Sequence, residues 1–340
     1  MHMMRRLTCL IILVALAGCT PRGTLQYAGI LSVPGQSIRP VFVATDRQPA
    51  PRGNDPLARQ RFGAVRDARL HYARLDVSIP PDHREGRIEW PDKTEADPAR
   101  HFTVADSELY SDPAPWLAAI DDRQPPGGED VVLFVPGYNT THARAVYRTA
   151  QIAEDFDAPQ PIIAYSWPSA GMPGRYVYDR DSVIFARDGL EQLLGDLTRG
   201  GDRTVTIVAH SMGSQLVMET LRQISIAGDR QTLSQVSAVA LLSPDIDEDV
   251  FLAQARRIDP FPQPFVLMVS ARDRVLELAA WLVGRPSRLG SIEDPGRLAG
   301  LPVTVVDLTG LGEGGLPGGH STAFTAPAAI ALIRDMAPID

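Results

Sequence analysis

Six short apolar runs alternate with longer amphipathic stretches over the larger, C-terminal part of the chain. The apolar runs are Val131–Val135, Pro161–Ser166, Thr204–Ala209, Val236–Leu242, Pro264–Ser270 and Pro302–Leu308. Nearly continuous apolar runs of this length are typical of strands that are covered on both faces. The stretches between them include Ala143–Phe156, Ser182–Thr198 and Met212–Ile224, each long enough for a helical crossover. This alternation predicts an α/β fold with a mostly parallel central sheet and helices on both faces.

The N-terminal part of the chain has a different pattern. Residues 25–127 are rich in Pro, Arg and Asp, and two short runs, Pro40–Thr45 and Tyr72–Ile79, have strand character. This change of pattern predicts two parts after the leader. Residues 19–127 are expected to form a β-containing N-terminal extension that packs on an α/β core of residues 128–340.

The first 18 residues have the pattern of an export signal. Two arginines precede an apolar run, Leu10–Leu16, that is shorter than the roughly 20 residues a membrane-spanning helix needs. The residues after this run resemble the lipobox of bacterial lipoproteins. The resemblance implies removal of residues 1–18, attachment of acyl chains such as palmitate to Cys19, and a lipid anchor in the cell envelope. Thr20 favours the outer membrane, facing the periplasm, and the alternative is an ordinary secreted protein cleaved near Ala17.

Composition and charge narrow the classes of partner. Of the 340 residues, 44% are hydrophobic, so the chain can bury a substantial core. The 33 basic and 41 acidic residues give a net charge of −8 at pH 7, whereas a nucleic-acid-binding protein needs a basic surface. The chain has two cysteines, Cys9 and Cys19, and no His-Glu-x-x-His motif. We therefore expect no nucleic-acid partner, no metal and no cofactor.

A candidate nucleophile follows the third apolar run directly. Thr204–Ala209 leads into His210, Ser211, Met212 and Gly213, and a helical pattern begins there. A serine between a buried strand and a helix, with small residues two positions before and after it, is typical of a nucleophile elbow. Ala209 replaces the commoner glycine. The alternative is a serine that only caps the helix.

A serine nucleophile needs a base and an acid, which in this arrangement follow in the order serine, acid, histidine. His320 is the one histidine after Ser211, so it is the candidate base. Asp273 follows the strand that directly precedes the last one, so it is the preferred acid. Asp245, Asp247 and Asp249 follow the strand before that; Asp245 is the alternative acid, and the other two are expected to lie at a solvated helix start. The side chain of His210 is expected to point away from the serine hydroxyl and to have a structural role.

The oxyanion of an acyl-transfer reaction needs backbone N–H donors. Met212, directly after the serine, is expected to supply one of them. The second is expected from the loop after the first core strand. Pro136 has no N–H, so Tyr138 is the candidate donor, and Gly137 permits a close approach of the loop.

These motifs, taken in order, resemble a bacterial family of α/β-hydrolase proteins in the esterase/lipase superfamily, a group known as a domain of unknown function. The matching pieces are Val41–Arg47, Pro80–Gly86, Gly137–Asn139, Ser166–Ser169, Tyr178 with Asp181, His210–Gly213, Pro244–Asp247, Ser270–Leu276, Arg288–Gly290 and Gly319–Ser321. The resemblance implies Ser211 as nucleophile, Asp273 as acid and His320 as base. Where the family has a histidine before the loop glycine, this chain has Pro136. Gly137, Asn139 and Trp167 are candidate residues of the substrate pocket, with core packing the alternative for Trp167.

The sequence therefore predicts an α/β-hydrolase fold and a serine hydrolase of the carboxylesterase or lipase type. A small-molecule or lipid ester is the expected substrate, cleaved through an acyl-enzyme. The same triad serves acyltransferases, thioesterases and amidases, and sequence alone does not separate these activities. The alternative from another class is a non-catalytic envelope lipoprotein that uses the fold as a binding scaffold, which would account for Pro136.

Overall fold

The computed structural model describes residues 23–29, 33–50, 62–91, 96–284, 288–311 and 319–336. The predicted signal peptide and Cys19 lie outside these residues. Among the residues described, no helix has both the length and the apolar character required to cross a membrane.

Strands and helices alternate along most of the described chain. The strands are β1 (Ser37–Pro49), β2 (Phe62–Ile79), β3 (Thr103–Tyr110), β4 (Asp130–Val135), β5 (Ile162–Tyr165), β6 (Thr204–His210), β7 (Val236–Leu242), β8 (Phe265–Val269) and β9 (Thr304–Asp307). The α-helices are α2 (Pro113–Asp121), α3 (His142–Asp155), α4 (Tyr176–Thr198), α5 (Met212–Ala227), α6 (Arg230–Ser234), α7 (Glu248–Ala255), α8 (Arg274–Val283), α9 (Thr322–Thr325) and α10 (Pro327–Met336). Two 3₁₀ turns, η1 (Leu289–Ser291) and η2 (Pro295–Leu298), lie between α8 and β9.

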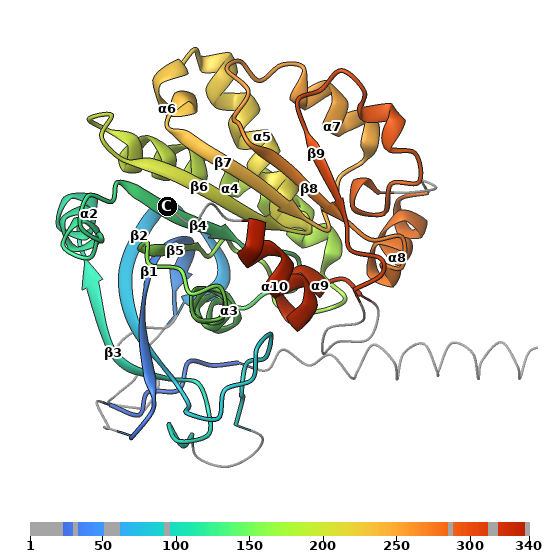
Figure 1. Cartoon of the computed structure of the whole chain (residues 1–340). Helices are drawn as coiled ribbons and strands as arrows, with labels where there is room; N and C mark the ends of the chain where they lie inside the picture. The colour runs from blue at the N-terminus through green and yellow to red at the C-terminus, as the bar shows by residue number, and fades with distance from the viewer. Residues whose placement is uncertain are drawn as a thin grey trace, which may run out of the picture.

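The nine strands form a single sheet in the order β3-β2-β1-β5-β4-β6-β7-β8-β9 (Figure 1). β2 is antiparallel to both of its neighbours, and the pairs from β1 to β9 are parallel. The predicted mostly parallel α/β sheet is thus confirmed. All six predicted core strands are present, with ends that differ by two residues or fewer.

The strands of the N-terminal extension belong to the same sheet as the core. The two predicted runs are the central part of β1 and the C-terminal part of β2. β1 pairs with β5 of the core from Val41–Ile162 to Ala44–Tyr165. β3 and α2 were not predicted from the sequence. β3 is an edge strand with several polar side chains, so its apolar signal is weak. The sheet therefore runs on across the predicted boundary at residue 128.

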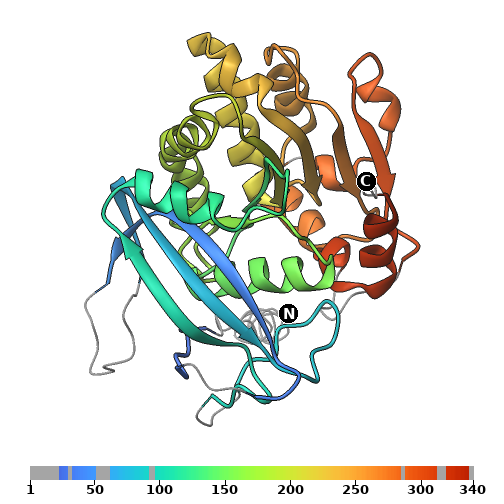
Figure 2. The same cartoon turned by 60° about the vertical axis from the view of Figure 1, so that its left-hand side comes forward.

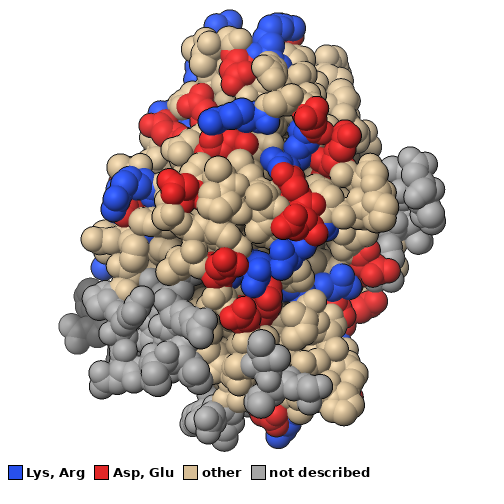
Figure 3. Space-filling model, turned by 90° about the vertical axis from the view of Figure 1, so that its left-hand side faces the viewer, with Lys and Arg blue, Asp and Glu red and all other residues tan. Residues whose placement is uncertain are grey.

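Helices cover both faces of the sheet, and alternate side chains of each strand enter two apolar cores. Phe42 and Ala44 of β1 pack with residues of α2, α4, α5, α6 and α7, whereas Val41 and Val43 pack with residues of α3 and α9. Figure 2 shows the long strands β1–β3 at one end of the molecule, with α3 crossing behind them. Acidic and basic side chains are interspersed on the face shown in Figure 3, where Lys and Arg form no extended patch.

The parallel strands bring three site segments to one edge of the sheet. Gly137 follows β4, Ser211 follows β6 directly, and Asp273 follows β8. In α/β sheets, ligands bind beyond the carboxyl ends of the strands at a point where the strand order reverses. Here β5 lies on one side of β4 and β6 on the other, so the reversal falls at β4 and β6.

Candidate active site

Ser211 occupies a strained turn between β6 and α5. Its φ of 53° and ψ of −122° lie in a region that side chains other than glycine seldom adopt. The backbone holds this conformation, because the Ser211 N–H donates to the Leu242 carbonyl (2.9 Å) and its carbonyl accepts from the Asp245 N–H (3.1 Å). Such strain costs about 1–3 kcal/mol and is typical of functional sites. The predicted strand–serine–helix turn is therefore present.

Two glycines permit the close packing around this turn. A Cβ on Gly213 would lie 2.5 Å from the Val135 carbonyl oxygen, at the end of β4. A Cβ on Gly137 would lie 2.8 Å from Ser211 Cβ and 2.8 Å from His210 Nδ1. No side chain fits at these distances, so only glycine allows the loop after β4 to approach Ser211. The predicted close approach of Gly137 is thus observed.

His320 and Asp273 form a hydrogen-bonded pair. His320 Nδ1 lies 2.7 Å from Asp273 Oδ2, and the Asp273 side chain is fully buried. The other carboxylate oxygen of Asp273 accepts from the N–H groups of Val275 (3.1 Å) and Leu276 (3.0 Å) in the first turn of α8. Asp273 is thereby fixed at a helix N-terminus, where a negative charge is favoured. With Nδ1–H directed to the carboxylate, His320 Nε2 is the proton acceptor.

Asp245, the alternative acid, has other partners. Its Oδ1 accepts from Arg288 Nε at 2.6 Å, and its Oδ2 accepts from the Tyr176 hydroxyl at 2.8 Å. Arg288 also donates to the Asp245 carbonyl (2.9 Å). Both Asp245 and Arg288 are buried, so this is a buried ion pair that joins the segment after β7 to the segment before η1. The structure therefore pairs His320 with Asp273 and not with Asp245.

His210 supports the segment that carries His320. The His210 Nε2–H donates to the His320 carbonyl oxygen at 2.9 Å, and the two rings lie 4.7 Å apart. Burial, together with the nearby His320, lowers the pKa of His210 well below its ordinary value, so this ring stays neutral. The predicted structural role of His210 is consistent with this contact. Sequence reasoning did not find that the partner of His210 is His320.

A buried polar network fixes the loop that follows Gly137. Asp179 of α4 accepts from the Asn139 N–H (3.0 Å), the Ala170 N–H (2.7 Å) and the Ser169 hydroxyl (2.6 Å). From the other side, buried Arg47 donates to the carbonyls of Thr140 (2.8 Å) and Ser169 (2.9 Å). Because Asp179 holds the amide of Asn139, that amide is not aimed at the serine. The sequence comparison had singled out Tyr178 and Asp181 here, and Asp179 between them is the residue that binds the loop.

Trp167 supports the same loop from inside the protein. Its side chain is fully buried, and its indole N–H donates to the Pro136 carbonyl at 2.7 Å. This position agrees with the core alternative rather than with a surface in the substrate pocket. The Tyr138 hydroxyl donates to the Pro173 carbonyl, which ties the loop to the start of α4. Met212 is the first residue of α5, so its N–H is among the amides that have no partner within a helix.

The N-terminal extension holds the segment after His320 through a cluster around Asp155 of α3. Asp155 accepts from the Gly86 N–H at 2.6 Å and contacts His83 Nε2 at 2.9 Å. Gln151, one turn earlier on α3, donates to the Phe324 carbonyl at 3.2 Å. The Phe324 ring in turn packs 4.9 Å from the ring of His210.

Gly86 and His83 are the parts of this cluster that sequence analysis missed. A Cβ on Gly86 would lie 2.6 Å from the carbonyl carbon of Thr325. His83 also contacts Glu89 at 2.8 Å. Burial opposes the charge of His83, but hydrogen bonds to Asp155 and Glu89 outweigh it and raise the pKa of His83 to about 9. Residues 80–86 had been noted only as a matching piece, and their contact with α9 is a tertiary feature.

Within the described ranges, no cluster of three or more His, Cys, Asp or Glu residues could hold a metal ion. The arrangement that is present can perform nucleophilic chemistry. It offers a serine on a strained turn, a histidine oriented by a buried carboxylate, and a loop that only glycine brings close to the serine.

Solved structures of several hydrolases are similar to this chain. The chain is similar to a dienelactone hydrolase from Anabaena variabilis, at 15% identity over 63% of this chain and 86% of that one, with a TM-score of 0.37. It is also similar to Aspergillus fumigatus lipase B, at 16% identity over 67% of this chain and 58% of that one, with a TM-score of 0.37. A third similar structure is a dienelactone hydrolase-like promiscuous phosphotriesterase from metagenomic libraries, at 13% identity over 78% of this chain and 91% of that one, with a TM-score of 0.36. No curated protein sequence matches the chain significantly.

The family is established by sequence. Residues 120–335, more than half of the chain, match the family described as alpha/beta hydrolase of unknown function (DUF900). The matched region begins in α2 and includes Ser211, Asp273 and His320. The parallel sheet, the turn at Ser211 and this match lead to one conclusion: the chain belongs to the DUF900 family of α/β hydrolases.

Proposed function

We propose that the protein is a serine hydrolase that cleaves a carboxylic ester through an acyl-enzyme. The observation that carries the proposal is the hydrogen-bonded pair of Asp273 and His320, whose interacting atoms lie 2.7 Å apart. This pair is linked to the serine turn, because His210, which directly precedes the strained Ser211, donates to the carbonyl of His320. A neutral serine hydroxyl is a weak nucleophile and needs an oriented base of this kind. The membership of an α/β-hydrolase family supports a hydrolase in general terms.

In this mechanism His320 Nε2 takes the proton of Ser211 as its oxygen attacks the ester carbonyl. His320 then gives that proton to the leaving alcohol, and a water molecule, deprotonated by the same ring, releases the acyl group. Asp273 holds the tautomer with the proton on Nδ1 and stabilises the imidazolium that forms. His210, which is uncharged, adds no like charge beside that imidazolium.

The oxyanion is assigned to the backbone N–H groups of Met212 and Tyr138. The hydrogen bond from Asn139 to Asp179 and the support of the Pro136 carbonyl by Trp167 fix the loop that carries Tyr138. Removing one such donor typically costs about 2.7–4 kcal/mol of transition-state stabilisation. The missing N–H of Pro136 therefore does not by itself prevent catalysis.

We propose a short-chain or soluble ester as the substrate. The connection between β7 and β8 carries one eight-residue helix, α7, which leaves little room for a large lid over the site, and a site without such a lid suits a short or soluble ester better than a triglyceride. We further propose that Cys19 carries a lipid anchor that holds the enzyme at the outer membrane. This anchor would place lipid esters of the envelope within reach, so they are the second substrate class to test. Thioesters and acyl transfer use the same residues and are tested alongside.

The experiment is acyl-enzyme trapping. The full chain is mixed with p-nitrophenyl acetate, quenched in acid and measured by intact mass spectrometry. We expect a mass increase of one acetyl group that is absent in Ser211→Ala and retained in Ser214→Ala. Ser214 is a matched control because it is also buried, three residues along α5, and its hydroxyl bonds to the Ala209 carbonyl.

The alternatives give different results in the same experiment. An acyl-enzyme that forms and then transfers the acetyl group to an added alcohol faster than to water would indicate an acyltransferase. An acyl-enzyme that forms only from a thioester would indicate a thioesterase. No acylation of the folded protein by esters or thioesters would reject the proposed chemistry in favour of the binding scaffold.

A further inference from the structure

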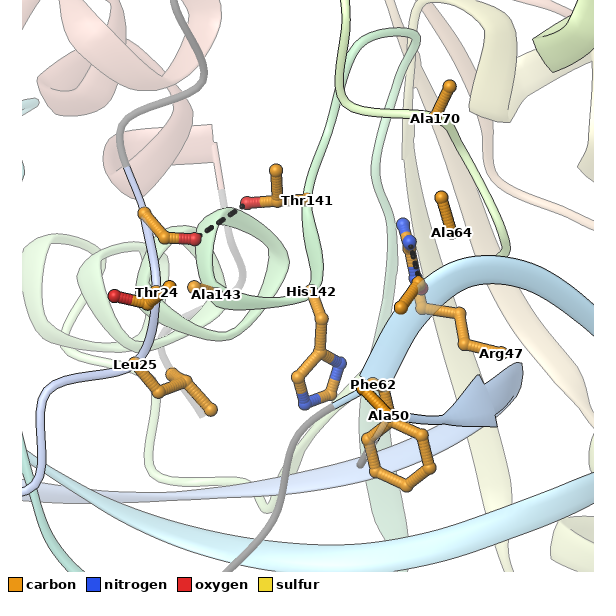
Figure 4. A pocket seen from close by; sticks show the side chains of 12 residues that line it. Thr24, Leu25, Arg47, Ala50, Phe62, Ala64, Thr141, His142, Ala143 and Ala170 are labelled. Atoms are coloured by element: carbon orange, nitrogen blue, oxygen red, sulfur yellow. Dashed lines mark hydrogen bonds between the residues drawn. The ribbon is translucent and has the colours of Figure 1, made fainter. Parts of the chain in front are cut away.

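A cavity of about 250 Å³ lies at the N-terminal end of α3 and is lined by none of the triad or oxyanion-loop residues named above. Its walls come from segments far apart in the sequence: Leu25 near the start of the described chain, Arg47 of β1, Phe62 of β2, and Thr141 and His142 at the start of α3. Figure 4 shows His142 between Leu25 on one side and Phe62 and Arg47 on the other. Apolar groups from several alanines complete the walls.

His142 presents a buried donor without a partner. The residue is 4% exposed, and among the described residues its Nε2 makes no hydrogen bond. Its Nδ1 lies 3.1 Å from the Ser166 hydroxyl oxygen, which already accepts from Arg47 Nε at 3.1 Å. Since arginine only donates, the Ser166 hydrogen is free to go to His142 Nδ1. On this pairing we assign the proton of the neutral ring to Nε2.

The ring is neutral because burial and the charge of Arg47 lower the pKa of His142 to about 3. A buried N–H without an acceptor is destabilising, and such groups usually have a partner in the functional state of a protein. His142 thus holds an unpaired hydrogen-bond donor just behind the cavity wall, which a ligand reaches when the side chains over it move aside. An oxygen acceptor is the chemistry that would satisfy it.

Two further features favour an acceptor that carries negative charge. The cavity lies at the first turn of a 14-residue helix, where the helix dipole is positive, and Thr141 caps the Arg144 N–H at 3.2 Å. The buried guanidinium of Arg47 lines the same cavity. Two carboxyl groups lie near Arg47. Asp179 already accepts from three donors of the two adjoining loops. Burial raises the pKa of Asp46 to about 7, so this carboxyl compensates the charge of Arg47 less than an ordinary aspartate would.

The rest of the cavity suits an apolar body. Leu25 and Phe62 face it, and the Phe62 ring lies 5.0 Å from the His142 ring in an edge-to-face arrangement. At about 30 Å³ for each water-sized group, the volume holds roughly eight such groups. We propose that this cavity is a binding site for a short-chain monocarboxylate, with the carboxylate at His142 Nε2 and the start of α3 and the alkyl chain against Leu25 and Phe62.

The test is a titration of the full chain with sodium hexanoate, followed by ¹⁵N NMR of the labelled histidines. We expect a saturable shift of the His142 Nε2 signal. Hexanol, which has the same chain but no charge, is expected to bind at least about tenfold more weakly. Binding is expected to be unchanged in Ser211→Ala, so this site and the proposed chemistry succeed or fail separately.

Two variants test the assignment. His142→Asn keeps an amide near the position of Nδ1 for Ser166 but removes Nε2, and isothermal calorimetry is expected to give at least about tenfold weaker binding of hexanoate. Ala64→Leu adds bulk to the cavity from β2, leaves the His142 residue itself unchanged, and is expected to abolish binding. Val65→Leu is the matched control, since Val65 is the next residue and is 58% exposed.

Three results would overturn the proposal. The first is no shift of the His142 signal up to about 10 mM hexanoate, a concentration that saturates even a millimolar site. The second is equal affinity for hexanol and hexanoate, which would reject the carboxylate. The third is unchanged hexanoate binding in Ala64→Leu, which would place the ligand elsewhere and does not depend on the folding of His142→Asn.

Discussion

Replacing Gly86 with alanine tests whether the N-terminal extension positions His320, the proposed base. Gly86 has a φ of 80°, and a Cβ there would lie 2.6 Å from the Thr325 carbonyl carbon. Ordinary contact begins at 3.4 Å, so the two backbones must separate by at least the difference, 0.8 Å, and by more than this for the Thr325 carbonyl oxygen, which lies closer still. Thr325 lies at the end of α9, five residues after His320. A displacement of this size in a catalytic group costs up to about 10²-fold in rate, so we expect kcat for ester hydrolysis to fall about 10- to 100-fold.

Gly228→Ala is the matched control for this prediction. Gly228 has a φ of 81° at the end of α5, and a Cβ there meets nothing within 4 Å. Both variants carry the same left-handed backbone strain, about 1–2 kcal/mol, but only Gly86→Ala pushes against α9. The assay is steady-state hydrolysis of a p-nitrophenyl ester by folded protein, checked by circular dichroism. Equal kcat values for the two variants would refute the reasoning.

The remaining predictions concern the acid, the pH dependence and the anchor. Asp273→Asn should lower kcat by about 10³- to 10⁴-fold with little loss of stability. Asp245→Asn should instead lower the free energy of unfolding by about 3–5 kcal/mol, because it leaves Arg288 unpaired. Steady-state kinetics and urea unfolding separate the two effects, and the reverse pattern would exchange the roles of the two residues. The folded-state pKa of His83 is raised from 6.5 to about 9, so its contribution to stability is complete below pH 6.5 and is lost as pH rises through 9. After allowance for solvent screening, this loss of stability amounts to about 2 kcal/mol between pH 7 and 10. It should be visible as a fall in the urea midpoint of unfolding over this pH range, and His83→Gln should remove that fall. A fall that persists in His83→Gln would contradict the prediction. Labelled palmitate should be incorporated in cells and lost in Cys19→Ala, and a label that survives this change would reject the anchor.

The features predicted correctly from sequence are those encoded by local patterns. Each buried strand of the core is a continuous apolar run, so the positions of the six strands follow from the hydrophobic pattern. Their parallel direction follows from the helical crossovers between them. The elbow at Ser211 requires only a strand, small flanking residues and a helix in immediate succession. His320 is the candidate base because no other histidine follows the serine, and the structure pairs it with Asp273, while its catalytic role stays a prediction.

The features that sequence did not predict depend on contacts between distant residues. Asp245 and Asp273 both follow strands. They differ because the carboxylate of Asp245 is bound by Arg288, which lies 43 residues later in the sequence. Residues 80–86 contain no signal that they would meet α9, because that contact forms only when both segments pack against α3. Asp179 has the same limitation, since its partners come from two separate loops.

The central claim is that Ser211 is an activated nucleophile, and labelling with a fluorophosphonate probe tests it most directly. The full chain, Ser211→Ala, His320→Ala and the control Ser214→Ala would be compared by in-gel fluorescence after folding is verified. We predict labelling of the wild type and of Ser214→Ala, no labelling of Ser211→Ala and strongly reduced labelling of His320→Ala. No labelling of the folded wild type, or a label that remains in Ser211→Ala, would contradict the account.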